Sequence, residues 1–435
     1  MEALFDGVIC GKALRGSVRK IGRKAKPWAG WKPKRSRPPQ TYGPAGGRGG
    51  PGNFLVISPP AVPNSRPLLS SAVLSSPAVR PLAVGGGQYQ VRQLPEAAAP
   101  PVLPLAYEPF LYLTPPHLAL QRNDGFRAAF FLEDTHRGFT LAHLPVFADA
   151  AGHAARSPWQ APFGAVQLAP DLPTDVLTAF LLTVQQQLAA AGVRQLTLRP
   201  CPFAYAPQAS ARLTQVLTQL GYRVGLAEIN NHLPFEADFR AQLHPSERRR
   251  LHKCERHGLR FEQEPPLLLP WAYEFLSRCR QEKGQSLSLP LERLQELFRE
   301  FPNQHFLFSV RDAEGNWAAL TVAILVGNGV LYNFYPASPL AYNAFSPVVL
   351  LNAGLHAFGR ASGLRLLDLG TSTLPEGLNY SLLQFKRHLG GVPSLKLTFE
   401  RELPHPQPLL SGRGVCSDGA HVWHPSPGGE GLGVG

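Results

Sequence analysis

The sequence predicts a mixed α/β fold in which one α/β module occurs twice, with a long tail at each end of the chain. The main observation is an order of helix, strand, helix and strand that appears once in each half. Glycines end both helices of each unit, and the matched glycines are almost equally far apart. Gly192 and Gly363 are separated by 171 residues, and Gly221 and Gly390 by 169. Such a constant offset indicates a duplicated structural unit.

The two ends of the chain predict disordered tails rather than packed domains. Residues 1–103 and 403–435 are rich in Pro and Gly, and such segments bury too little apolar surface to offset the entropy of ordering them. The chain has a net charge of +13, but residues 1–100 contain 15 of the basic residues and 3 of the acidic ones. The body is therefore nearly neutral, and its charge does not mark it as a nucleic-acid binder.

The first module is expected over residues 104–236. Two segments, GFRAAFFLED and GFTLAHLPVF, have the composition and alternation of strands. They are followed by a helix in PTDVLTAFLLTVQQQLAAAG, a strand in VRQLTLRP, a helix in ASARLTQVLTQLG and a strand in YRVGLAEINNHLPFE. Gly192 and Gly221 stand where glycine commonly ends a helix.

The second module, expected over residues 237–402, repeats this order after a basic helix in HPSERRRLHKCERHG. HFLFSVRD and WAALTVAILVGNGVLYNFYP are strand-like, and Gly327-Asn328-Gly329 predicts a hairpin turn. The segment SPVVLLNAGLHAFGRASG predicts a helix with Ser346 as its N-cap and Pro347 at its first position. The strand LRLLDLG, the helix NYSLLQFKRHLGG and the strand PSLKLTFERE complete the module.

Two charged residues of the second module are the first candidates for a site. Asp368 stands at the end of an apolar strand, where α/β sheets commonly place ligands, although it could instead cap the loop DLGTST. Lys386 lies at the border of an apolar helix face made of Leu378, Leu382, Phe385 and Leu389. Its ammonium could reach a carbonyl oxygen or a phosphate there, or its stem could lie along apolar neighbours with the charge in water.

The first module provides a comparison within the chain. Its positions equivalent to Asp368 and Lys386 are Thr197 and Leu217, which carry no charge. We therefore expect the chemistry in the second module. We also predict that Asp368 and Lys386 face one slot and act at one reacting centre.

Tyrosines are further candidates, because a phenol can protonate a leaving group or hold an acceptor hydroxyl. Tyr332 and Tyr335 lie in the strand segment VLYNFYP, and Tyr380 begins the last helix. The alternative is that these aromatic side chains belong to the core.

Basic residues provide candidates for anion binding. Arg249, Lys253 and Arg256 form one stripe along the basic helix and could bind phosphate, and Arg280 in SRCRQEKG could hold an anion. A solvated helix face is the alternative for the stripe.

Neither a metal centre nor a disulfide framework is predicted. The chain has five cysteines, an odd number, and contains neither a CxxC nor an HExxH motif. A reducing, cytoplasmic setting is therefore expected. No apolar run reaches the roughly 18 residues that span a bilayer, and the N-terminus MEALFDG lacks the pattern of a signal peptide.

Several segments, taken in order, resemble the FemAB-like branch of the GNAT acyltransferase superfamily. They are SPWQAPFGA, HPSERRRLHKCERHG, YNAFSPVVLLNAGLHAFGRASG with LRLLDLG, and QFKRHLGG, and the resemblance covers roughly residues 105–402. It implies two GNAT-like modules and transfer of an acyl or aminoacyl group, from acyl-CoA or an aminoacyl-tRNA, to an amine. The acceptor that it implies is a small molecule or a cell-wall (peptidoglycan) precursor. Lys386, in the pair FK of QFKRHLGG, resembles a functional lysine of these enzymes.

One segment departs from the GNAT pattern. Acetyl-CoA-dependent modules have a loop, Arg/Gln-x-x-Gly-x-Gly/Ala, whose N–H groups bind the pyrophosphate. The matching segment here, SPLAYNAFSPVV, contains no glycine, which argues against CoA binding in the usual manner.

The predicted function is therefore N-acyl or N-aminoacyl transfer by direct attack of an amine, without a covalent enzyme intermediate or a permanently bound cofactor. Two other interpretations stay open. One is a catalytically silent relative that binds an envelope precursor, and the other is an RNA-binding protein that uses the basic N-terminal arm.

Overall fold

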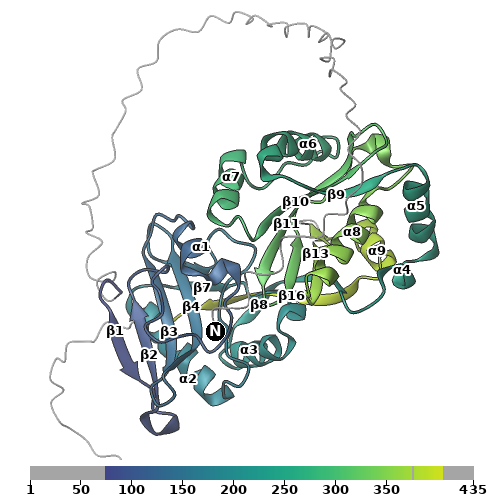
Figure 1. Ribbon diagram of the computed structural model, residues 1–435. Coiled ribbons are helices and arrows are strands. Elements are labelled where there is room, and N and C mark those ends of the chain that lie inside the picture. The colour runs from purple at the N-terminus through teal and green to yellow at the C-terminus, as the bar shows by residue number, and fades with distance from the viewer. Residues whose placement is uncertain (1–73, 375–376, 405–435) are drawn as a thin grey trace, which may run out of the picture. The chain divides into compact units, whose positions relative to one another are not determined.

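The computed structural model describes residues 74–374 and 377–404 (Figure 1). The predicted tails at residues 1–103 and 403–435 therefore lie mostly outside the described residues. Where the first tail is described, the structure differs from the prediction, because strands β1 (Ala78–Pro81) and β2 (Tyr89–Leu94) form one edge of the sheet. Val91 and Gln93 of β2 are buried. The alternation of buried and partly buried residues along β2 therefore indicates a strand, even though the surrounding composition is rich in Pro and Gly.

The remaining strands of the first half are β3 (Arg127–Asp134), β4 (Phe139–Ala148), β5 (Ala154–Ser157), β6 (Gln167–Leu168), β7 (Gln195–Leu198) and β8 (Arg223–Pro234). Those of the second half are β9 (Arg260–Glu264), β10 (His305–Arg311), β11 (Trp317–Gly327), β12 (Val330–Asn333), β13 (Leu366–Thr371) and β16 (Val392–Glu402), with a small pair formed by β14 (Thr373–Leu374) and β15 (Gly377–Leu378). The large strands form one mixed sheet in the order β1-β2-β3-β4-β5-β7-β16-β8-β13-β12-β11-β10-β9, and β6 pairs with β4.

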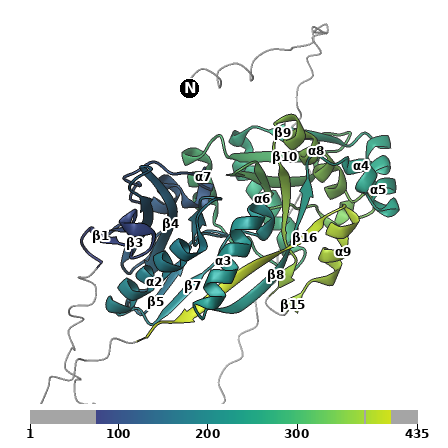
Figure 2. The ribbon, with the colours of Figure 1, turned by 90° about the horizontal axis from the view of Figure 1, so that it is seen from below.

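The two halves exchange their final strands at the centre of this sheet. β8, the last strand of the first half, pairs antiparallel with β13 of the second half. β16, the last strand of the second half, pairs antiparallel with β7 of the first half. β8 and β16 also pair with each other, and Figure 2 shows β16 running beside β8 toward the first half. The boundary predicted at residue 236 divides the chain into two segments. Each segment nevertheless contributes its last strand, β8 or β16, to the strands of the other segment.

Helices cover both faces of the sheet. α2 (Thr174–Ala190) and α3 (Pro207–Gln219) pack on the core of the first half. In the second half, α6 (Leu269–Gln281) and α7 (Leu291–Glu300) pack with one hydrophobic cluster, on what we call the α6 face. The opposite face, here the α8 face, is covered by α4 (Phe239–Gln242), α5 (Pro245–Arg256), α8 (Val348–Ala361) and α9 (Tyr380–His388).

The first half also contributes to the α6 face. Phe110, Tyr112, Phe163 and Tyr205 come from the first half and belong to the same cluster as α6 and α7. Tyr112 lies in the 3₁₀ turn Leu111–Leu113, which precedes helix α1 (Pro115–Ala119), and Tyr205 lies in the 3₁₀ turn Phe203–Tyr205. Side chains from both halves therefore meet over β12 and β13.

The predicted mixed α/β class with two repeated units is confirmed, and each predicted helix–strand–helix–strand order is present. Glycines follow the helices as expected, for instance Gly192 with φ of 91° and Gly363 with φ of 67°. The prediction for Ser346 was wrong. α8 begins at Val348 without a side-chain cap, because Ser346 has a φ of 54° and precedes a proline, which disfavours helical backbone.

Candidate functional site

The site is built around an irregularity in β13. In the antiparallel pairing of β13 with β8, Asp368 lies opposite His232 and Thr371 lies opposite Asn230, so β13 contains one extra residue between them. Gly370 lies in this bulge with a φ of 74°, a conformation that glycine adopts without strain. β-Bulges bend the strand and redirect groups, and they are frequent next to active sites.

Asp368 is held rigidly at the start of the bulge. Its carboxylate is 2% exposed and accepts hydrogen bonds from Asn230 Nδ2 at 2.7 Å, from the Gly370 backbone N–H at 2.8 Å and from the Tyr205 hydroxyl at 2.5 Å. Tyr205 comes from the first half and the other donors from the central strands. The expected loop cap is thus only part of what Asp368 does, since it also joins the two halves.

Lys386 lies at the end of the same bulge, on α9. The side chain is 6% exposed, and its ammonium donates to the carbonyl oxygens of Gly370 at 2.8 Å and Thr371 at 2.7 Å. The sequence placed Lys386 at the border of an apolar helix face. The structure buries it instead and leaves Leu382 of that face 37% exposed. The alternative of a surface lysine with its charge in water is therefore excluded.

Burial changes the proton affinity of this lysine. Removal from water disfavours the charged form and lowers the pKa of Lys386 to about 8, although the negative charge of Asp368 partly opposes this shift. Lys386 is therefore mostly cationic at neutral pH and loses its charge at mildly alkaline pH. An ammonium has three donors, and within the described residues two of them are engaged.

Asp368 and Lys386 approach the bulge from opposite faces of the sheet. Asp368 points to the α6 face, where it meets Tyr205, whereas α9 packs on the α8 face through Leu389 and Phe385. The prediction that both side chains face one slot was therefore wrong. What joins them is Gly370, whose N–H binds the carboxylate and whose carbonyl binds the ammonium.

Buried phenols surround Asp368 on the α6 face. The pKa of Tyr205 is raised well above its usual range by burial and by the charge of Asp368. Tyr332 lies opposite Asp368 in the parallel pairing of β12 with β13, and burial followed by the charge of Asp368 raises its pKa as well. The Tyr112 hydroxyl is enclosed without a hydrogen-bond partner among the described residues. These hydroxyls stay protonated and can act only as neutral donors or acceptors.

The other predicted tyrosines lie apart from this group. The Tyr335 hydroxyl is bonded to Ser288 Oγ at 2.5 Å and to the Leu289 N–H at 3.1 Å. Tyr380 is 76% exposed at the start of α9.

The predicted anion-binding residues are not brought to the bulge. Arg249 and Arg256 are exposed on α5. Lys253 donates to the Ala344 carbonyl at 2.9 Å and lies over the Phe345 ring. Arg280 donates to Gln285 Oε1 at 3.1 Å. None of these four contacts Asp368 or Lys386, and their role in binding an anion stays a prediction.

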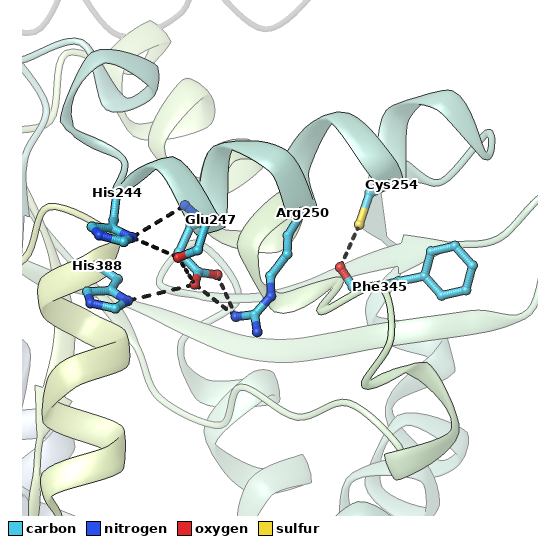
Figure 3. Close-up of polar contacts among 7 residues, drawn as sticks. His244, Glu247, Arg250, Cys254, Phe345 and His388 are labelled. Carbon is cyan, nitrogen blue, oxygen red and sulfur yellow. Dashed lines mark hydrogen bonds and ion pairs between the residues drawn. The ribbon is translucent and has the colours of Figure 1, made fainter.

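A polar cluster fixes the end of the helix that carries Lys386 (Figure 3). The His244 N–H donates to the His388 carbonyl at 2.9 Å, and the two imidazole rings stack with centroids 4.1 Å apart. Next to them Glu247 is 1% exposed and accepts two hydrogen bonds from Arg250, at 2.8 and 3.0 Å. The start of α5 thus holds the end of α9, and Lys386 lies two residues before His388.

Two pockets flank the Phe203–Tyr205 turn. One, the His232 pocket, has a volume of 580 Å³, and its polar lining residues are His232, Glu236, Arg365 and Ser394. The other, the Phe110 pocket, has a volume of 510 Å³ and a mainly apolar lining that includes Phe110, Val166, Tyr205 and Leu213. Arg365 lines both, and it donates to the Ala204 carbonyl at 3.1 Å and the Tyr205 carbonyl at 2.7 Å. The turn therefore separates two spaces that reach the surroundings of Asp368.

The segment that would bind the pyrophosphate of CoA has its N–H groups engaged elsewhere. The Leu340 N–H donates to the Glu282 carboxylate at 2.8 Å. Tyr342, Asn343, Phe345 and Ser346 donate to carbonyl groups within the segment. The departure seen in the sequence is thus accompanied by a backbone that does not offer the usual phosphate-binding donors.

Sequence reasoning found Asp368 and Lys386 but missed Tyr205, Asn230, Arg365 and His232. These residues reach the bulge through the register of β8 on β13 and through the packing of the first half on the second. Local sequence patterns predict neither of these features. The available signal was the polar group Asn230-Asn231-His232 inside an otherwise strand-like segment. Within the described residues no group of three or more His, Cys, Asp or Glu side chains could hold a metal ion, and no helix is long and apolar enough to span a membrane.

Comparison with known proteins gives similarity in solved structures alone. No protein-family model matches the chain, and no curated protein does. FemX is similar at 13% identity over 63% of this chain and 87% of its own, with a TM-score of 0.49. A tandem GNAT protein from the clavulanic acid biosynthesis pathway is 13% identical over 65% and 84%, with a TM-score of 0.38.

L-PGS from Bacillus licheniformis is 14% identical over 61% of this chain and 82% of its own, with a TM-score of 0.41. At these identities the similarity concerns the fold.

Proposed function

We propose that this chain is an N-acyltransferase that moves an acyl or aminoacyl group from an activated donor to an amine. The observation that carries the proposal is the bulge at Gly370, which binds a buried carboxylate through its N–H and a buried ammonium through its carbonyl oxygen. Burying charges away from water is unfavourable unless each is paired or hydrogen-bonded. Two such groups at one strand end are typical of a site where charge is used in a reaction, and Tyr205 and His232, which neighbour Asp368, each line a pocket.

The chemistry assigns a role to each group. An amine attacks the donor carbonyl, the carbonyl oxygen becomes negative, and the bond to the leaving group then breaks. We assign the third N–H of Lys386 to that developing oxyanion, as preorganised donors act in acyl transfer. This role requires the donor carbonyl to reach the bulge itself, because Lys386 approaches the bulge from the α8 face and Asp368 from the α6 face. Asp368 accepts three hydrogen bonds, and a carboxylate has about four acceptor positions. The remaining one can orient the amine.

The donor is an acyl-CoA or an aminoacyl-tRNA, and the acceptor is a small-molecule amine or a peptidoglycan precursor. The engaged N–H groups at Leu340–Ser346 weigh against a CoA thioester held in the usual GNAT manner. The His232 pocket is our choice for the acceptor, since it is the more polar of the two and His232 lies opposite Asp368.

A product screen tests this function. The purified chain is incubated with acyl-CoAs, aminoacyl-tRNAs and amine acceptors including peptidoglycan precursors, and products are identified by mass spectrometry. Lys386→Met should lower kcat/KM by about 10²-fold or more, whereas the exposed Lys283→Met is the matched control and should not. Wild-type turnover in the Lys386→Met variant would remove the lysine from the mechanism. Absence of any acylated amine would favour the catalytically silent interpretation.

A further inference from the structure

His232 lies beside Asp368 on the face of the sheet where the pockets open. The two residues are directly opposite each other in the pairing of β8 with β13, and opposite residues of paired strands project to the same face about 5 Å apart at Cβ. On its other side His232 is paired with Val392 of β16. The imidazole therefore stands between the fixed carboxylate and the His232 pocket, which it lines.

The two ring nitrogens of His232 differ in their surroundings. Nδ1 is enclosed and has no hydrogen-bond partner among the described residues. Nε2 makes no hydrogen bond with any residue that the structure describes and is not among the enclosed atoms, and the residue lines a pocket of 580 Å³. Exchange of a proton with a molecule in the pocket therefore takes place through Nε2.

Burial favours the neutral form of this ring. Burial is the largest influence and lowers the pKa of His232, the charge of Asp368 raises it, and the charge of Arg365 lowers it. Glu236, two residues after the end of β8, lines the same pocket and is exposed. A neutral imidazole has one ring nitrogen free to accept a proton, so the ring suits a base better than an acid.

We propose that His232 is the general base that removes the proton from the attacking amine. The proposal rests on the proposed acyl transfer and adds the acceptor's binding place, the His232 pocket. The amine nitrogen forms a bond to the donor carbonyl carbon and becomes cationic. Nε2 takes one of its protons, the carbonyl re-forms, and the bond to the sulfur or oxygen leaving group breaks. The leaving group then receives that proton from Nε2, so the ring returns to its neutral form, and an amide and a protonated thiol or alcohol are formed without any change in oxidation state.

The test combines removal of the ring with its replacement by a small molecule. His232→Ala should lower kcat/KM by about 10²-fold, the range for a lost general base. Added imidazole should restore part of the rate in proportion to its concentration, because the pocket is open and the deleted side chain leaves room beside it. The ratio of kcat/KM for the wild type to that for His232→Ala should fall as the pH drops below the pKa of His232, because a protonated ring cannot accept a proton.

Two variants provide controls. His252→Gln changes an exposed histidine of α5 and should leave kcat/KM unchanged with and without imidazole. His232→Gln keeps a polar side chain of similar size, so it should fold normally yet remain inactive, which separates loss of a base from loss of the fold. Full activity of either His232 variant, or a loss that imidazole does not reverse, would overturn the proposal while leaving acyl transfer in place.

A measurement without turnover checks the same geometry. The pKa of His232, followed by NMR in the full chain, should be lower in Asp368→Asn than in the wild type, because the negative charge that raises it is gone. An unchanged value would show that the ring does not face Asp368 and would contradict the assignment. A wild-type chain that acylates no amine would refute the proposed function itself, a result distinct from an active chain that does not need His232.

Discussion

At the scale of single residues, the burial of Lys386 makes its charge sensitive to pH near neutrality. Its pKa is lowered to about 8, so it is cationic below that pH and neutral above it. If the ammonium stabilises an oxyanion, the ratio of kcat/KM for the wild type to that for Lys386→Met should fall as the pH rises through about 8. Ionisation of the acceptor amine affects both enzymes equally and cancels in the ratio. A ratio that stays constant between pH 6 and pH 10 would contradict a role for the charge.

Tyr205 offers a second residue-scale prediction. Its hydroxyl donates to the buried Asp368 carboxylate at 2.5 Å, and a hydrogen bond to a charged group contributes about 1.5–3 kcal/mol. Tyr205→Phe should lower the free energy of unfolding by about that amount and also lower kcat/KM. Tyr107→Phe is the matched control, since the Tyr107 hydroxyl is enclosed without a partner among the described residues. Denaturant unfolding should show a smaller change, or none, for the control.

Only part of the site could be predicted at this scale. Asp368 and Lys386 stand out because they are charges at the boundary of apolar segments, a local pattern. Tyr205 and His232 carry no such mark. Their positions follow from the register of β8 on β13 and from a turn of the first half that packs on the second, and both are set by contacts between residues more than 100 positions apart.

At the scale of elements, the bulge of β13 can be tested through its glycine. Gly370 has a φ of 74°, and an added Cβ would lie 3.5 Å from the Tyr332 ring, an ordinary contact. Gly370→Ala should therefore cost about 1–2 kcal/mol of stability through backbone conformation. It should lower kcat/KM well beyond that effect, because the change displaces the Gly370 N–H that binds Asp368 and the Gly370 carbonyl that binds Lys386.

Gly363→Ala is the control for this prediction. Gly363 has a similar φ of 67°, and an added Cβ there would meet no atom within 4 Å. Both variants should lose similar stability in thermal or denaturant unfolding, while only Gly370→Ala should lose activity. Equal activities at a temperature where both are folded would mean that the bulge is a structural feature without a catalytic role.

Elements differ in how well their sequences predict them. The helices ended by Gly192, Gly221, Gly363 and Gly390 were predicted because their apolar period and terminal glycines are local signals. β1 and β2 were missed since their short strands lie in a Pro- and Gly-rich region. The burial of Lys386 was missed because helical spacing gives the apolar side of α9, whereas tertiary packing decides how α9 is turned against β13.

At the scale of the whole molecule, the exchange of final strands predicts that the two halves depend on each other. β8 extends the sheet of the second half and β16 that of the first, so either half alone exposes unpaired strand edges and loses its central neighbour. Residues 74–236 and 237–404, expressed separately, should each fail to give a cooperative thermal transition. Produced together, they should associate and elute as one complex in size-exclusion chromatography. The contrary outcome, two halves that each unfold cooperatively and do not bind each other, would mean that the modules are independent domains and that the exchanged strands contribute little to stability.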